Sequence, residues 1–201
     1  MTATVAEERD ANVAHLRAQT RKLELEGEHL AFAYETRRDF LFSSTIDDRS
    51  VDTCIEVCTH WARTKEPITV TLMSPGGGTF SGFGLIDFLA DLSAELYVTT
   101  SVYGYAASMA VAVLQAGTIR TMSPNSYLML HEASTLMRGA TSSLRDQVDF
   151  MEKMQARYVA VCASRSNVDA AYIADKTNRR DWWLDADEAL ELGFVDEIRK
   201  A

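Results

Sequence analysis

The 201-residue sequence has no long apolar run, little cysteine and no excess of positive charge. No stretch approaches the roughly 18 consecutive apolar residues that a membrane-spanning helix needs. The charged N-terminus also lacks the apolar core of a signal peptide. These absences predict a cytoplasmic protein without a membrane span. The formal net charge is −9 and the Lys and Arg residues are scattered, which argues against a nucleic-acid-binding surface.

The three cysteines cannot all pair, and their spacing shows no disulfide framework. Cys54, Cys58 and His60 lie close enough in sequence to suggest a metal site. However, the two cysteines share a helical face with Val51, which is the pattern of small core residues, and His60 points elsewhere. We therefore predict structural cysteines, no metal ion and no cofactor.

Hydrophobic residues make up 47% of the chain, enough for one sizeable core. We predict a charged helical N-terminal extension over residues 1–31 and one folded domain over residues 32–201. Val13, Leu16 and Leu23 form an apolar stripe in the extension that is too narrow to bury a solitary helix stably. The extension is therefore expected either to fray or to pack on a neighbouring subunit or partner.

Within the domain, apolar β-branched runs alternate with amphipathic helical segments. This order is typical of βαβ units around a largely parallel sheet, so the predicted fold class is α/β. The expected strands are residues 39–42, 68–73, 95–102, 119–122, 127–130 and 194–198. The expected helices are residues 49–64, 82–92, 108–114, 141–165 and 169–175, and a last helix that Asp185 and Glu188 cap and Gly193 ends.

The first candidate catalytic residue is Ser108, in the stretch Gly-Tyr-Ala-Ala-Ser-Met-Ala. It lies where a predicted strand passes into a helix, so backbone N–H groups are unpaired there and negative charge is stabilised. Ser108 is a candidate nucleophile, and the N–H of Met109 is placed to face an oxyanion. Taken alone, a serine at such a position is more often a helix N-cap or a packing residue.

Three further stretches make the catalytic interpretation stronger. Residues 74–78 read Ser-Pro-Gly-Gly-Gly, a glycine turn that can donate a second N–H to an oxyanion. His131 ends an apolar strand, the position that catalytic groups occupy in layered α/β folds. Asp181 precedes two tryptophans, a setting expected to hold it buried against an imidazole.

Four linked motifs, Ser-Pro-Gly-Gly, Gly-Tyr-Ala-Ala-Ser-Met-Ala, Met-Leu-His and Arg-Asp-Trp-Trp-Leu, resemble the proteolytic subunit of the Clp protease family. The resemblance runs from about residue 39 to residue 198. It implies a ClpP/crotonase-like fold and a serine endopeptidase in which Ser108 is the nucleophile, His131 the general base and Asp181 the imidazole orienter. It also implies an oxyanion hole made by the backbone N–H groups of Gly77 and Met109.

The same resemblance implies partners. A polypeptide substrate would pair as a strand with Glu132, Ala133 and Ser134, and the helix over 141–165 would be a handle between stacked heptameric rings. An AAA+ unfoldase would deliver the substrate. The order Ser, His, Asp and the lack of a Gly-x-Ser-x-Gly elbow argue against an α/β-hydrolase. Sequence alone leaves three alternatives to Asp181 as the orienting carboxylate, namely Asp175, Asp185 and Asp187.

The chain also departs from the family pattern. Residues 1–38 lack the pore-lining segment that helps dock an unfoldase, which speaks against that partner. The segment after His131 has lost most of its glycine, and Arg179 stands where the family often has an acidic residue, so an inter-ring ion pair there would change sign. These departures are similar to those of divergent phage and prophage members, some of which process capsid proteins.

Three functions therefore stay open at this point. The first is a compartmentalised serine endopeptidase, acting either in ATP-dependent proteolysis or in phage protein processing. The second is an enoyl-CoA hydratase-like enzyme of the same superfold, which would not require Ser108 or His131. The third is a catalytically silent assembly subunit, against which the presence of all three triad residues argues.

Overall fold

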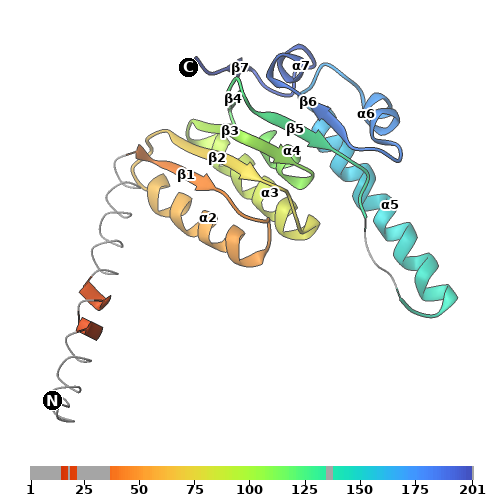
Figure 1. Cartoon of the computed structure of the whole chain (residues 1–201), viewed down its shortest axis with the longest axis horizontal. Helices are drawn as coiled ribbons and strands as arrows, with labels where there is room; N and C mark the ends of the chain where they lie inside the picture. Colours follow the sequence, from red (N-terminus) through yellow and green to blue (C-terminus); the bar gives the residue numbers. More distant parts are fainter. Residues whose placement is uncertain (1–14, 18, 22–36, 135–137, 201) are drawn as a thin grey trace, which may run out of the picture. The chain divides into compact units, whose positions relative to one another are not determined.

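The computed structural model describes residues 15–17, 19–21, 37–134 and 138–200. The chain divides after Arg38, and the unit Asp39–Ala201 contains the sheet, its covering helices and the candidate site (Figure 1). In the preceding unit, residues 15–17 and 19–21 are helical and Leu16 is exposed. The rest of the predicted apolar stripe and the predicted boundary at residue 31 lie outside the described residues.

The described residues form one seven-stranded sheet in which most pairs are parallel. Its strands are β1 (Asp39–Phe42), β2 (Ile68–Ser74), β3 (Val98–Ala107), β4 (Ile119–Met122), β5 (Tyr127–Leu130), β6 (Trp182–Leu184) and β7 (Glu197–Ile198). The order β1-β2-β3-β4-β7 is parallel throughout, and β5 branches off to pair with β3 and, antiparallel, with β6. The predicted α/β class is confirmed.

The observed strands differ from the expected ones in three places. Strand β3 continues to Ala107 rather than ending at residue 102, β6 was not predicted, and the last strand covers two residues rather than 194–198. The extension of β3 matters most. Its final residues pair with β5 in the register Ala107 to Met129, so the residues that follow the two strands emerge side by side.

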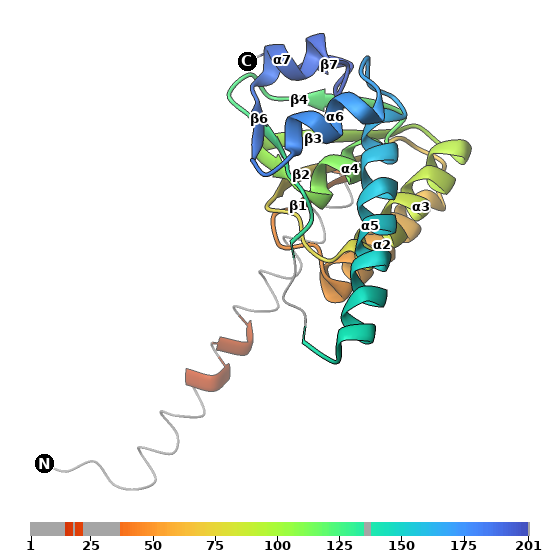
Figure 2. The ribbon, with the colours of Figure 1, turned by 90° about the vertical axis from the view of Figure 1, so that its right-hand side faces the viewer.

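Six helices are assigned among the described residues from 39 to 200, and most match the expected ranges. They are α2 (Asp48–Ala62), α3 (Thr79–Glu95), α4 (Met109–Leu114), α5 (Thr141–Ala163), α6 (Ala170–Thr177) and α7 (Ala186–Glu191). Helix α3 is longer at both ends than predicted. Helices α2 and α3 lie side by side along the sheet. The N-terminal half of α5 projects beyond the sheet, and its C-terminal half runs past α3 and α4 (Figures 1 and 2).

Two local predictions are confirmed. Val51, Cys54 and Cys58 are buried together on one face of α2, whereas His60 is exposed. Asp185 caps α7 and forms the expected capping box with Glu188. Among the described helices, none is both long and apolar enough to cross a membrane.

Candidate active site

Ser108 is the single residue between the end of β3 and the start of α4. Its backbone has φ 54° and ψ −128°, a conformation that non-glycine residues rarely adopt and that persists only where the surroundings fix it. Two backbone hydrogen bonds do so here. The Ser108 N–H donates to the Met129 carbonyl oxygen at 2.7 Å, and the Ser108 carbonyl accepts from the Val111 N–H at 2.9 Å. The serine is therefore held between a neighbouring strand and the first turn of its own helix.

His131 follows β5 directly and meets the serine. Its Nε2 atom lies 2.8 Å from the Ser108 Oγ atom, within hydrogen-bond range. This contact follows from the sheet register, because β5 pairs with the last three residues of β3. A hydroxyl hydrogen-bonded to an imidazole is the arrangement that allows the imidazole to take the hydroxyl proton during nucleophilic attack.

Asp181 lies on the other side of the imidazole. Its Oδ1 atom is 4.0 Å from His131 Nδ1, which is close but longer than a hydrogen bond. The strand that delivers it is β6, which directly follows Asp181 and pairs antiparallel with β5, placing Trp182 opposite Leu130.

The prediction of a buried Asp181 is wrong, because its side chain is 59% exposed. The two tryptophans that follow it do not cover it. Trp183 is itself largely exposed, and Trp182 packs edge-on against Tyr172 and Phe194.

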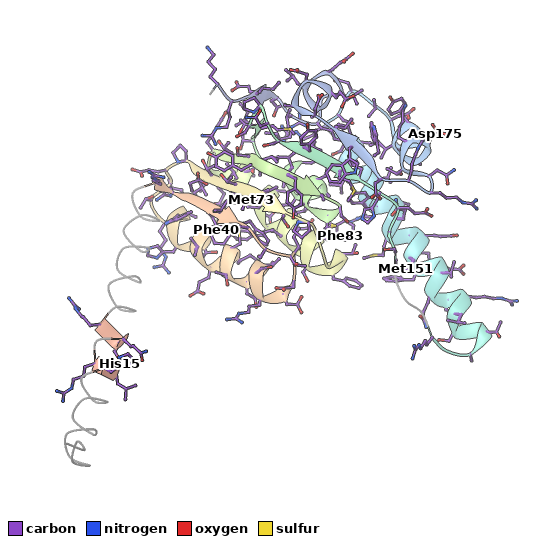
Figure 3. The ribbon with its side chains drawn as sticks, viewed as in Figure 1. His15, Phe40, Met73, Phe83, Met151 and Asp175 are labelled. Atoms are coloured by element: carbon purple, nitrogen blue, oxygen red, sulfur yellow. The ribbon has the colours of Figure 1, made fainter. Side chains whose placement is uncertain are left out.

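The three alternative carboxylates lie elsewhere. Asp185 accepts the Glu188 N–H at 2.9 Å as the N-cap of α7, and Asp187 is in the first turn of that helix. Asp175 lies on α6 (Figure 3). Within the described residues, Asp181 is the carboxylate that the structure pairs with His131.

The glycine turn after β2 also reaches the site. Ile46 donates its N–H to the Gly76 carbonyl at 2.8 Å and accepts the Gly78 N–H at 2.7 Å. In such a parallel bridge the residue between the two bonded ones directs its own N–H away from the partner, so the Gly77 N–H points away from Ile46. A side chain is not tolerated here, because a Cβ on Gly77 would overlap the Ile46 carbonyl oxygen.

One pocket joins these groups. Its lining residues are Gly77, Thr79, Ser108, Met109, His131, Ala133, Met154, Gln155 and Tyr158. Both predicted oxyanion donors therefore border the same space as the nucleophile and the base. The last three lining residues come from α5 and were not predicted as site residues. In the sequence, Met154 and Tyr158 belong to an apolar repeat with three- and four-residue steps, and such a repeat indicates only that this face of the helix is covered.

The segment after His131 forms a second feature of the site. Glu132, Ala133 and Ser134 are exposed, and the Ala133 N–H donates to the Gln155 side-chain oxygen at 2.9 Å. A groove of about 820 Å³ continues from this segment between α5 and α6. It shares Ala133 and Gln155 with the pocket around Ser108.

No group of His, Cys, Asp or Glu side chains in the described residues is arranged to hold a metal ion. Cys54 and Cys58 are both buried free thiols. The hydrogen bond with Cys58, together with burial, raises the pKa of the Cys54 thiol well above its ordinary value. Because both side chains lie on the buried face of α2 with Val51, we interpret this pair as a packing element.

A serine within hydrogen-bond distance of a histidine at the ends of adjoining parallel strands, with backbone N–H groups beside it, is the arrangement typical of hydrolases that use a serine nucleophile. Comparison with known proteins gives the family. The family model for Clp protease matches residues 29–201. The chain belongs to the Clp protease family and is a serine-type peptidase.

Curated relatives agree with this assignment. An ATP-dependent Clp protease proteolytic subunit of Porphyromonas gingivalis is 29% identical over 200 residues, covering 97% of this chain and 83% of the relative. Proteolytic subunit 2 of Tropheryma whipplei is 35% identical over 137 residues, covering 67% and 74%. Proteolytic subunit 3 of Rhodococcus jostii is 30% identical over 166 residues, covering 81% of each chain.

Proposed function

We propose that this chain is an endopeptidase that cleaves polypeptides through Ser108, His131 and Asp181. The observation that carries the proposal is the 2.8 Å contact between Ser108 Oγ and His131 Nε2. As Oγ attacks the scissile carbonyl carbon, Nε2 takes the hydroxyl proton and later gives it to the leaving amine. Water then hydrolyses the acyl-enzyme ester by the same route.

The backbone N–H groups of Gly77 and Met109 are the proposed oxyanion hole. Both residues border the pocket that contains Ser108, and the Gly77 N–H points away from its bridge partner. Met109 is the first residue of α4, a position whose N–H has no acceptor within its own helix. Two such donors stabilise the negative oxygen of the tetrahedral intermediate.

Asp181 is the proposed orienter of the imidazole. At 4.0 Å from Nδ1 and with an exposed side chain, it can reach hydrogen-bond distance by a small rotation. An ionised carboxylate there would fix the tautomer in which Nδ1 carries the proton and Nε2 is free to accept one.

The substrate is proposed to lie as an extended strand along residues 132–134. Because the Ala133 N–H is already donated to Gln155, the pairing groups are those of Glu132 and Ser134, which share one edge when the segment is extended. The adjoining groove between α5 and α6, about 820 Å³ in volume, continues from this segment and so supports a polypeptide substrate over a small acyl substrate. The family match likewise favours a peptidase over the enoyl-CoA hydratase-like alternative.

Ring assembly and an ATP-dependent partner belong to the same proposal. The relatives' names describe proteolytic subunits of an ATP-dependent protease, which favours that role over phage protein processing. Exposed apolar side chains on α3 and α5, including the stacked pair Phe80 and Phe150 at 6.0 Å, suit a surface that is buried between subunits. The heptameric ring remains part of this proposal. Light scattering tests it, because the mass of the native particle gives the number of subunits.

Labelling with a fluorophosphonate probe tests the nucleophile. We expect wild type and the control Ser166→Ala, in the turn after α5, to be labelled, and Ser108→Ala to remain unlabelled and to lose cleavage of a fluorogenic peptide by about 10⁴-fold or more. Labelling that persists in Ser108→Ala would overturn the assignment. A wild-type protein that is neither labelled nor active would be the silent assembly subunit.

A further inference from the structure

Helix α5 contacts the backbone of the nucleophile itself. Tyr158, in the C-terminal half of α5, is 6% exposed, and its hydroxyl donates to the Ser108 carbonyl oxygen at 3.2 Å. Figure 2 shows α5 running past α4, the short helix that Ser108 precedes. This contact is separate from the catalytic hydrogen bond, because it involves the serine's carbonyl and not its side chain.

The Ser108 carbonyl and the Met109 N–H are two ends of one planar peptide group, so the direction of one fixes the direction of the other. The Ser108 torsions that set this direction, φ 54° and ψ −128°, are unfavourable for a side-chain-bearing residue. Two donors hold the carbonyl in place. One is the Val111 N–H from the same helix, and the other is the Tyr158 hydroxyl from a distant part of the chain.

We propose that Tyr158 is a positioning residue, whose hydroxyl holds the Ser108–Met109 peptide so that the Met109 N–H faces the forming oxyanion. The inference rests on the proposed function, in which that N–H is an oxyanion donor. Tyr158 acts through the peptide and makes no bond to the reacting atoms.

The protonation state of the tyrosine suits this role. Burial raises the pKa of Tyr158 well above its ordinary value, and the neighbouring Cys162 thiol contributes in the same direction. The phenol therefore keeps its proton, and can donate it, over the whole pH range in which a histidine base works.

The turn that follows α5 is anchored at the opposite end of α4, which makes α5 a suitable support. Arg165, two residues after the last residue of α5, donates to the carbonyls of Gln115, Gly117 and Thr118 after α4 ends. Gln155, about one turn before Tyr158, holds the Ala133 N–H. Helix α5 thus contacts the nucleophile's peptide and the proposed substrate strand, and the turn after α5 contacts the far end of α4.

The variant Tyr158→Phe tests the inference, because it keeps the ring and its packing and removes only the donor. We expect kcat for a fluorogenic peptide to fall about three- to tenfold, the effect of losing one neutral hydrogen bond, with KM unchanged. The affinity for a peptide boronate, which mimics the tetrahedral intermediate, should fall by a similar factor. The affinity for an uncleavable peptide of the same sequence should stay the same. The control Tyr97→Phe, an exposed tyrosine ahead of β3, should match wild type in all three.

Three results would overturn the inference. An unchanged kcat and boronate affinity would mean that Val111 alone holds the peptide. A raised KM at constant kcat would make Tyr158 a wall of the substrate pocket, and a lowered melting temperature with unchanged kinetics would make it a packing residue. In all three cases wild type still shows Ser108-dependent cleavage. Its absence from wild type would instead refute the proposed function, and this inference with it.

Discussion

The two sides of the candidate site differ in how firmly the fold holds them. On the nucleophile side, all six residues of α4 are buried, and Ser108 is fixed by hydrogen bonds to Met129, Val111 and Tyr158. On the other side, the His131 side chain is 28% exposed and that of Asp181 is 59% exposed, and their atoms are 4.0 Å apart. The nucleophile is built into the core, whereas its orienting carboxylate lies at the surface.

This difference has a physical origin. Ser108 directly follows a ten-residue strand in the middle of the sheet, and both the neighbouring strand β5 and α5 contact it. Asp181 precedes a three-residue strand that has one partner, β5. Substitutions on the nucleophile side should therefore reduce activity and stability together, and substitutions on the carboxylate side should reduce activity alone.

After Ser108→Ala, the largest effect is expected from Gly77→Ala. The added Cβ would overlap the Ile46 carbonyl oxygen, and the residue's φ of +151° is itself unfavourable for alanine, so the loop must shift. Displacing an oxyanion donor should lower kcat about 10²- to 10³-fold. Because Ile46 is fully buried, the melting temperature should fall as well. Peptide cleavage and a thermal melt measure the two losses.

Gly84→Ala is the matched control for that prediction. Gly84 lies in α3, it is exposed, and a Cβ there would meet nothing within 4 Å. Alanine in a helix interior is more stable than glycine by about 0.5–1 kcal/mol, so this variant should melt higher and keep full activity. Full activity in Gly77→Ala as well would exclude the glycine turn from the oxyanion hole.

Asp181→Asn should have a smaller and purely catalytic effect. A buried triad aspartate is worth about 10⁴-fold in kcat. Here the carboxylate is exposed and beyond hydrogen-bond distance, so we expect a loss of about 10²-fold, at the lower end of what acid–base catalysis supplies. The melting temperature should not change, because exposed substitutions usually alter stability by less than about 0.5 kcal/mol.

Asp187→Asn provides the comparison, since Asp187 is an exposed carboxylate on α7. It should keep wild-type kcat. A loss near 10⁴-fold in Asp181→Asn would show that the carboxylate closes on His131 during turnover, and equal losses in both variants would refute the assignment of Asp181.

The nucleophile side and the carboxylate side also differ in how well the sequence predicts them. Apolar runs and glycine turns located the long elements of the central sheet, and strand ends located Ser108 and His131. The sequence pattern predicts the wrong structure where the local composition favours a turn but a distant strand pairs with the segment. Residues 103–107, with one glycine and two tyrosines, resemble a turn, yet they complete β3 because β5 pairs with them.

Two other features depend on contacts that periodicity does not encode. Strand β6 is only three residues long and all three residues are apolar, although Trp183 is exposed, so its sequence shows no alternation of apolar and polar residues. On α5, the three- and four-residue repeat predicts which face is covered but not what covers it. The repeat therefore gave no indication that Tyr158 reaches the Ser108 carbonyl.

The smallest effect on catalysis is expected from Asp196→Asn, in a region that supports the fold away from the site. Asp196 receives hydrogen bonds from the backbone N–H and the guanidinium of Arg120, whose side chain is 5% exposed. These bonds, the side-chain one above all, hold the pKa of Asp196 below its ordinary value. A folded-state pKa below the unfolded one adds stability above the unfolded pKa, near 3.9, and this stability is lost as the pH falls through the folded pKa.

The variant should therefore melt at a lower temperature than wild type at pH 7. The difference in melting temperature should narrow as the pH falls below about 4, because protonation then makes the wild-type carboxyl group neutral, as the asparagine side chain is. Its kcat at pH 7, measured well below the melting temperature, should equal that of wild type. Melting curves from pH 3 to 7 check the first expectation and peptide cleavage checks the second. A gap that stays constant with pH would attribute the loss to packing rather than to charge. A fall in kcat would show that the geometry of the candidate site depends on the C-terminal segment that Asp196 anchors.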